Sequence, residues 1–239
     1  MSDKRTRHRI IVVETPIEVQ WSAPADEPHM RDLLHAAERT RYDRFLRPED
    51  KARFVTGRFL ARTALAARTG LSPDAIAFTT ECPHCGADHG KPRLPGHDVD
   101  FSLSHSGDRV VLAVAEGVRI GVDVERESDR DIDRLAEMVL AAPEREDFAA
   151  LPLEERRRAF HVYWSRKEAV LKATGHGLAA PMTDLRLSAP GTAPEVLSWE
   201  GDAAVAPVRL ADLTPGAGYA AALAVLTAAP LKVTENPGP

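Results

Sequence analysis

Apolar and polar residues alternate along several short segments of the chain, a period of two that is typical of β-strands with one buried face. In residues 119–125, three β-branched residues alternate with a glycine and two acids. This pattern predicts a strand with Asp123 and Glu125 on one face and the apolar side chains on the other. Further strands are expected over residues 9–14, 18–21, 101–105, 109–115, 185–188 and 219–227.

Two long segments instead place apolar residues at helical spacing, which predicts amphipathic helices. The first runs from Lys51 to Thr69 and follows a proline and two acids, residues that suit the positive end of a helix dipole. The second runs from Leu153 to Ala173. A glycine shortly after each segment, Gly70 or Gly175, is typical of a helix C-terminus. Shorter helices are expected over residues 30–40, 132–140 and 143–148.

The order of these elements divides the chain into two halves. Each half contains a strand, a long helix and then further strands, and a break at Gly117 lies between them. We therefore expect a mixed α/β (α+β) fold with an N-terminal half, residues 1–117, and a C-terminal half, residues 118–239. Residues 81–96, rich in Cys, Pro, Gly and His, are expected to form a loop, and the proline-containing tail 228–239 to be loose.

The overall composition limits the classes of function. The chain has 239 residues, of which 44% are hydrophobic, and this is enough for a sizeable core. Its formal net charge of -5 argues against a general polyanion-binding protein. The apolar run at residues 10–13 is too short for a signal peptide or a membrane span, and two cysteines do not make a disulfide framework. We therefore expect a cytoplasmic protein.

Positive charge is concentrated in one part of this acidic chain. Nine Arg or Lys residues lie between Arg39 and Arg68. Such a cluster indicates a local anionic ligand. A solvated helix face rich in salt bridges explains the same pattern equally well.

Three carboxylates are the strongest candidates for chemistry. Asp123 and Glu125 share a strand face, and Glu168 shares a helix face with Trp164 and Lys172 because these residues recur every four positions. A set of carboxylates suits a hard divalent cation such as Mg²⁺, which prefers oxygen ligands and keeps positions for water and phosphate. An exposed Glu168–Lys172 pair without a metal is the alternative.

Two further motifs indicate phosphate binding. Ser104-His105, just before Ser106 and a glycine, combines hydroxyls, an imidazole and backbone N–H groups, although a turn with side-chain caps is a competing interpretation. Lys91, in a Gly-Lys-Pro sequence, could meet a phosphate as a point charge, although a surface lysine before a turn is the simpler interpretation of this motif alone. Neither a Walker A motif nor Gly-x-Ser-x-Gly occurs, which argues against a P-loop enzyme and an α/β-hydrolase.

The Cys-x-x-Cys motif of Cys82 and Cys85 resembles half of a zinc knuckle. A structural zinc site needs four ligands, so His84 or His89 would have to contribute. Free thiols on a loop are the simpler interpretation.

Taken together, the motifs resemble those of the Sfp-type 4′-phosphopantetheinyl transferases, and the matched region runs from about Arg41 to Leu187. Any one motif is weak, but the ordered set is specific, and the chain length resembles the broad-specificity branch. The resemblance implies two pseudo-twofold-related α/β halves in a chain that can act as a monomer. The motifs are Gly90-Lys91-Pro92, the stretch from Phe101 to Ser106, the stretch from Gly121 to Glu125, and the stretch from Trp164 to Leu178.

The resemblance also implies an activity. The family moves the phosphopantetheine arm of coenzyme A onto a serine of a carrier protein, with Mg²⁺, and releases 3′,5′-ADP. The implied partners are acyl or peptidyl carrier domains of fatty-acid, polyketide or nonribosomal-peptide synthesis, without nucleic acid or membrane.

Residue roles follow from the same resemblance. Asp123, Glu125 and Glu168 correspond to the Mg²⁺ ligands, and Asp123, Glu168 and Lys172 to the catalytic group. Glu168, or a water molecule held by the metal, is the implied base for the incoming serine. The implied coenzyme A contacts are Arg41, which would meet the 3′-phosphate, Arg53, His89, Lys91, Ser104, His105 and Lys172.

Three rival interpretations keep the same residues but change the function. A metal-dependent phosphohydrolase would use the three acids without a carrier protein. A nucleic-acid-binding module would use the basic helix and the cysteine loop and would bind in a salt-dependent manner. A structural relative without activity would not need the intact acids and Lys172.

Overall fold

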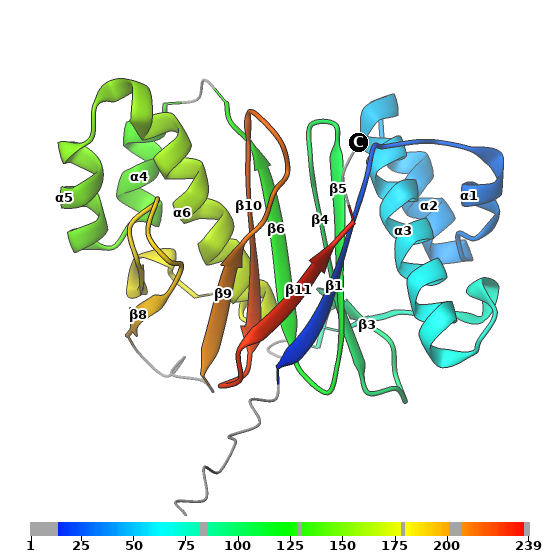
Figure 1. The fold of residues 1–239 in the computed structure, drawn as a ribbon. Helices are drawn as coiled ribbons and strands as arrows, with labels where there is room; N and C mark the ends of the chain where they lie inside the picture. Colours follow the sequence, from blue (N-terminus) through cyan, green and yellow to red (C-terminus); the bar gives the residue numbers. More distant parts are fainter. Residues whose placement is uncertain (1–13, 82–85, 129–130, 178–179, 201–206, 237–239) are drawn as a thin grey trace, which may run out of the picture.

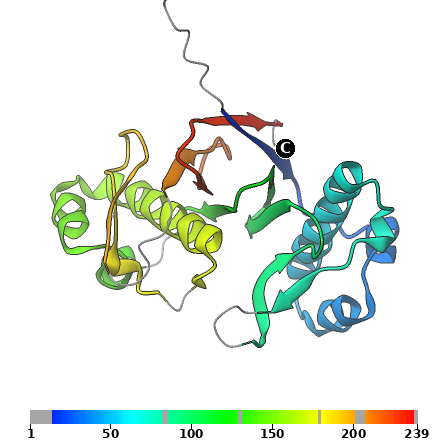
Figure 2. The same cartoon turned by 90° about the horizontal axis from the view of Figure 1, so that it is seen from below.

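The computed structural model describes residues 14–81, 86–128, 131–177, 180–200 and 207–236. Strands occupy the centre of the molecule, and two groups of helices cover its two outer sides (Figure 1). The view from below separates these helix groups clearly, with the strands between them (Figure 2). Among the described residues, none of the helices combines the length and apolar character needed to cross a membrane.

Each half of the chain follows the same order: a first strand, helices that end in a long one, a short hairpin and two further strands, to which the second half adds the final strand β11. The first half has β1 (Thr15–Ser22), α1 (Pro28–Asp32), α2 (Ala36–Arg44), α3 (Pro48–Thr69), β2 (Thr79–Glu81), β3 (Asp88–Arg93), β4 (Val99–Ser106) and β5 (Arg109–Glu116). The second half has β6 (Ile120–Arg126), α4 (Ile132–Val139), α5 (Ala142–Ala150), α6 (Leu153–Thr174), β7 (Leu185–Leu187), β8 (Val196–Trp199), β9 (Val208–Asp212), β10 (Tyr219–Leu226) and β11 (Leu231–Glu235).

The two main sheets repeat one strand arrangement. The first is ordered β11-β1-β5-β4 and the second β6-β10-β9, so β1, β5 and β4 correspond to β6, β10 and β9. The helices α3 and α6 both have 22 residues, and each ends at a glycine in the left-handed conformation. The predicted mixed α/β fold with two similar halves is therefore confirmed.

Two predictions in the first half were wrong. The single helix expected over residues 30–40 is two helices, because His35 is extended and the Glu38 carboxylate accepts a hydrogen bond from its backbone N–H at 3.0 Å, which starts a new helix. The loop expected over residues 81–96 contains most of the β2–β3 hairpin. Cys82 and Cys85 lie outside the described residues, as does most of the strand expected over residues 9–14.

The tail was also predicted incorrectly. Residues 231–235 form β11, which runs parallel to β1 in the sheet of the first half. Leu231 and Val233 pack on the apolar cluster between the two sheets, and Trp21 donates a hydrogen bond to Glu235 at 3.0 Å. Proline lies before and after this strand rather than within it, so the tail can pair. The half boundary near Gly117 stays a prediction, and this one strand of the second half joins the first sheet.

Side chains of β4 join the two halves where β4 lies beside β6. The Ser102 hydroxyl accepts a hydrogen bond from the Val122 backbone N–H at 3.0 Å, and the Ser106 hydroxyl accepts one from the Arg126 N–H at 3.1 Å. Hydroxyl groups on alternate residues of β4 thus accept the hydrogen bonds from β6 that backbone carbonyl oxygens accept inside a continuous sheet. This arrangement places the acidic face of β6 next to the serines of the predicted phosphate motif.

We expect Ser102→Ala to lower the free energy of unfolding by about 1–3 kcal/mol, because the buried Val122 N–H loses its acceptor. Urea denaturation measures the change. Ser72→Ala is the matched control, since Ser72 is exposed and makes no cap hydrogen bond. Equal stability of both variants would show that the Ser102 bond does not hold the halves together.

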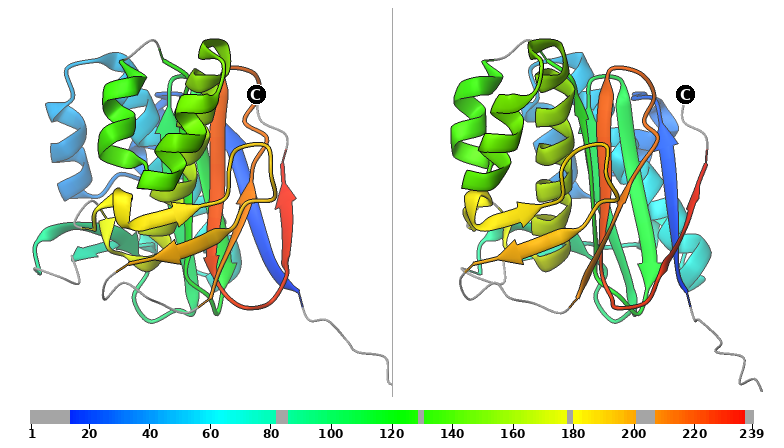
Figure 3. Two further views of the ribbon diagram at one scale, coloured as in Figure 1. Left: turned by 90° about the vertical axis from the view of Figure 1, so that its left-hand side faces the viewer. Right: turned by 60° about the vertical axis from the view of Figure 1, so that its left-hand side comes forward.

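The helix α6 lies against β6 and β10 (Figure 3), and the contact with β6 is unusually close. A Cβ atom at Gly121 would collide with the carbonyl oxygen of Ala169 and would lie 2.5 Å from the backbone nitrogen of Ala173. Glycine at this strand position therefore brings the helix face with Glu168 and Lys172 next to Asp123.

Candidate active site

The centre of the site is a contact between Asp123 on β6 and Lys172 on α6. The Lys172 ammonium donates to Asp123 Oδ1 at 2.6 Å and to the carbonyl oxygen of Val122 at 3.1 Å. The Ser104 hydroxyl donates to the same Asp123 oxygen at 2.7 Å. Both halves of the chain therefore contribute to one cluster, and three of the predicted site residues meet in it.

The other two carboxylates lie within the electrostatic field of Asp123. Burial and the Asp123 charge raise the pKa of Glu125 to about 7, although the Ser106 hydroxyl donates to Glu125 at 3.1 Å. Burial and the Asp123 charge also raise the pKa of Glu168, against the opposing effect of Lys172. Three carboxylates share a partly dehydrated space with one ammonium, so the site has an excess of negative charge.

This charge excess fits a divalent cation. Asp123 Oδ2 is buried and accepts no hydrogen bond, which leaves a carboxylate oxygen without compensation. Within the described part of the chain, no three acid, histidine or cysteine side chains converge closely enough to hold an ion as they stand. The oxygen donors suit Mg²⁺ in type and charge, and the metal site itself stays a prediction.

Buried ion pairs fix the helix that carries Glu168 and Lys172. Lys167 is fully buried, and its ammonium pairs with Glu144 at 2.6 Å and donates to the Met182 carbonyl oxygen at 2.9 Å.

A second buried ion pair lies on the same helix, where the fully buried Arg166 pairs with Asp212 at 2.6 Å. The sequence interpretation missed these positioning roles. No local pattern indicated them, because the partner acids Glu144 and Asp212 lie 23 and 46 positions away in the chain.

Basic residues border the carboxylates on the side of the first half. Arg53, on α3, donates to the carbonyl oxygen of Gly107 at 2.9 Å and pairs with Asp50 at 2.5 Å. Partial burial and the neighbouring cations Arg53 and Lys172 lower the pKa of His105. The predicted contacts Arg53, His105 and Lys172 therefore lie within electrostatic range of one another.

The turn that carries this border is tied to the second half by a residue that the sequence interpretation missed. The Tyr219 hydroxyl donates to Asp108 Oδ1 at 2.5 Å and accepts from the Asp108 backbone N–H at 3.1 Å. A side chain on Gly107 would collide with this hydroxyl. Tyr219 has no local sequence signal, because its partner is 111 positions away.

The expected basic surface between Arg39 and Arg68 is not continuous. Arg58 and Arg62 are buried and pair with Glu38 at 3.1 and 2.7 Å, so they belong to the interior. Arg41 is exposed and lies over the Phe54 ring at 5.4 Å. Arg41 therefore stays at the surface, whereas Arg58 and Arg62 show that part of the stretch is structural.

Lys91 is not free to meet a ligand in this conformation. Its ammonium pairs with Asp100 at 2.5 Å and donates to the Ile120 carbonyl oxygen at 2.6 Å. Burial lowers the pKa of Lys91 to about 8, although the Asp100 charge opposes the shift. Lys91 therefore joins β3 to β4 and β6, and its predicted contact with coenzyme A has no support from this geometry. His89 lies in β3, and its side chain is outside the described residues.

Comparison with known proteins gives consistent results. Residues 119–224 match the 4′-phosphopantetheinyl transferase superfamily, and residues 19–117 match the 4′-phosphopantetheinyl transferase N-terminal family. The 4′-phosphopantetheinyl transferase HetI of Nostoc sp. is 33% identical over 216 residues, which cover 86% of each chain. A 4′-phosphopantetheinyl transferase of Bacillus subtilis is 34% identical over 158 residues, which cover 66% of this chain and 67% of the relative.

A solved structure shows a partial likeness. The holo-[acyl-carrier-protein] synthase of Thermotoga maritima aligns with a TM-score of 0.39 and 26% identity, over 48% of this chain and 64% of that chain. The assignment therefore depends on the sequence matches, which extend over both halves. They show that this chain is an enzyme of the 4′-phosphopantetheinyl transferase superfamily.

Proposed function

We propose that the protein transfers 4′-phosphopantetheine from coenzyme A to a serine of an acyl or peptidyl carrier domain, with Mg²⁺, and releases 3′,5′-ADP. The observation that carries this proposal is the cluster of Asp123, Lys172 and Ser104, flanked by Glu125 and Glu168. It lies between the two halves and combines carboxylates for a metal with an ammonium for a phosphate.

The proposed reaction is a phosphoryl transfer. The carrier serine oxygen attacks the phosphorus that bears the pantetheine arm, a new P–O bond forms, and the bond to the bridging oxygen of the diphosphate breaks. The bridging oxygen leaves with the bonding electrons as part of 3′,5′-ADP. Glu168 would accept the serine proton, either directly or through a water molecule.

The cationic side chains neutralise negative charge on the diphosphate and orient it. Lys172 would move from Asp123 to a phosphate oxygen, and its charge stabilises the transition state more than the ground state. Arg53 and His105 orient the phosphates from the side of the first half. A Mg²⁺ ion held by Asp123, Glu125 and Glu168 would neutralise phosphate charge when bound.

The same proposal predicts a pH effect in the metal-free protein. The pKa of Glu125 is about 7 in the fold against an ordinary value of 4.5, so the fold binds this proton more tightly than the unfolded chain does. The stabilisation is present below the ordinary pKa and is lost as the pH rises through about 7. Thermal unfolding in EDTA should show this loss, and Mg²⁺ should reduce it.

Glu125→Gln should flatten this part of the stability curve, because the amide does not titrate. The exposed Glu146 supplies the matched control, Glu146→Gln, which should keep the wild-type curve. A wild-type curve in both variants would contradict the raised pKa of Glu125.

Incubation of the protein with coenzyme A and an apo carrier domain tests the function. Transfer predicts that the carrier gains the mass of one phosphopantetheine group and that a carrier with alanine at the acceptor serine gains none. The rival phosphohydrolase would instead release free phosphopantetheine without any carrier. Release of this kind, with no gain of carrier mass, would contradict the proposal.

A further inference from the structure

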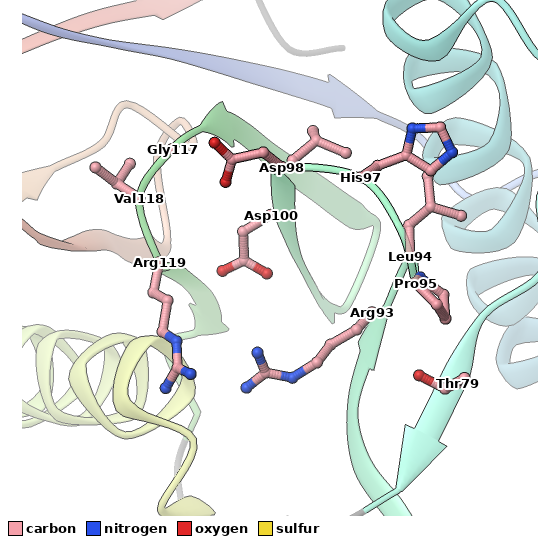
Figure 4. Close-up of a pocket in the computed structure, with 11 residues that line it drawn as sticks. Thr79, Arg93, Leu94, Pro95, His97, Asp98, Asp100, Gly117, Val118 and Arg119 are labelled. Atoms are coloured by element: carbon pink, nitrogen blue, oxygen red, sulfur yellow. The ribbon is translucent and has the colours of Figure 1, made fainter.

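A polar cavity lies at the far end of β4 and β6 from the carboxylates (Figure 4). Its volume is about 440 Å³, and its lining comes from the end of β3, the start of β4 and the segment before β6. Residues of both predicted halves therefore form its walls. A cavity of this size can hold a small ligand.

Two arginines dominate this cavity. Figure 4 shows the guanidinium groups of Arg93, at the end of β3, and Arg119, just before β6, projecting into the cavity from opposite walls. Among the described residues, neither side chain donates a hydrogen bond or pairs with a carboxylate. Two guanidinium groups that face each other without an acid repel, unless an anion lies between them.

The nearby acids are directed elsewhere. Asp100 accepts from the Lys91 ammonium at 2.5 Å and from the Ile120 backbone N–H at 2.9 Å. The Asp98 carboxylate points toward Gly117 and away from both guanidinium groups (Figure 4). The charges of Arg93 and Arg119 both lower the pKa of Lys91, so both arginines lie near its ammonium. Three cations therefore lie around the carboxylate of Asp100.

We propose that Arg93 and Arg119 form a binding site for a phosphate-bearing anion between the two halves, separate from the carboxylate site. Guanidinium groups bind phosphate oxygens through two parallel hydrogen bonds, and two such groups can hold one phosphate from both sides. The phosphate could belong to the nucleotide end of coenzyme A, which rests on the proposed function, or to a free phosphate ion.

Binding of inorganic phosphate to the purified full-length protein, measured by calorimetry, tests the site without any turnover. We expect Arg93→Gln and Arg119→Gln each to weaken binding about tenfold or more, as the loss of a charge-assisted pair implies. Arg134→Gln is the matched control, because Arg134 is exposed on α4 and does not line the cavity. Urea denaturation checks that all three variants are folded.

Competition with coenzyme A distinguishes the two sources. If the cavity holds the nucleotide end, coenzyme A displaces phosphate and both variants raise the KM for coenzyme A. If it holds a free ion, coenzyme A does not displace phosphate and the KM is unchanged. Phosphate binding that is absent from the wild type, or that is equal in the two cavity variants and the control, would overturn the proposal. These two overturning results concern the cavity alone, because carrier loading depends on the carboxylate site.

Discussion

Asp123→Asn should lower the rate of carrier loading about a hundredfold to a thousandfold, the size of effect seen when one electrostatic stabiliser of a transition state is removed. Asp123 holds Lys172 and Ser104 through one carboxylate oxygen, and its other oxygen is buried without a partner. The amide is nearly isosteric but carries no charge. The variant therefore loses both a proposed metal ligand and the group that positions Lys172.

The measurement is the initial rate of carrier mass gain at saturating coenzyme A and Mg²⁺. Asp147→Asn is the matched control, because Asp147 is exposed on α5. Circular dichroism and urea denaturation should show that Asp123→Asn is folded, since the Lys172 side chain keeps some access to water. A folded Asp123→Asn variant with a wild-type rate would contradict the site assignment.

Gly121→Ala should lower the free energy of unfolding by about 3 kcal/mol or more, at the upper end of the cost of overpacking a core. The added methyl group would collide with the backbone of α6 at Ala169 and Ala173. Backbone atoms cannot rotate away as the end of a side chain can, so the helix must move from the strand. Urea denaturation measures the loss.

Gly57→Ala gives the matched control for this prediction. Gly57 lies inside α3, and a Cβ there would contact Leu103 at an ordinary 3.7 Å. Alanine favours the helix by up to about 1 kcal/mol over glycine, so this variant should be as stable as the wild type or more stable. If Gly121→Ala is equally well tolerated, then close packing of α6 on β6 does not position Glu168 and Lys172.

Local patterns predicted the elements that carry the candidate site. The strand with Asp123 and Glu125 and the helix with Glu168 were expected. Alternation of apolar and polar residues in the strand, and recurrence of residues every four positions in the helix, can both be seen within a short stretch of sequence. Gly121 also gave a signal, since a glycine inside a strand often marks close approach of another backbone. No local pattern indicated that Lys172 would pair with Asp123 rather than with Glu168.

Long-range contacts explain where the sequence interpretation was incomplete or wrong. The strand β11 is short and forms only because β1, more than 200 positions earlier, offers an edge and an apolar surface. Arg58 and Arg62 count as surface charges in the sequence, but Glu38 and the aromatic rings of Phe54 and Phe78 allow them to be buried. The contact of Lys91 with coenzyme A stays a prediction, and no local pattern indicated that Asp100 would pair with Lys91.

The proposed function requires that the three carboxylates use a divalent cation when phosphopantetheine moves from coenzyme A to a carrier serine. Its most direct test is the intact mass of an apo carrier domain after incubation with coenzyme A and the metal-stripped protein, first in EDTA and then with excess Mg²⁺. We expect no change in EDTA, and with Mg²⁺ a gain of one phosphopantetheine group matched by an equal amount of 3′,5′-ADP. A gain that is the same in EDTA, or no gain with Mg²⁺, would contradict the account.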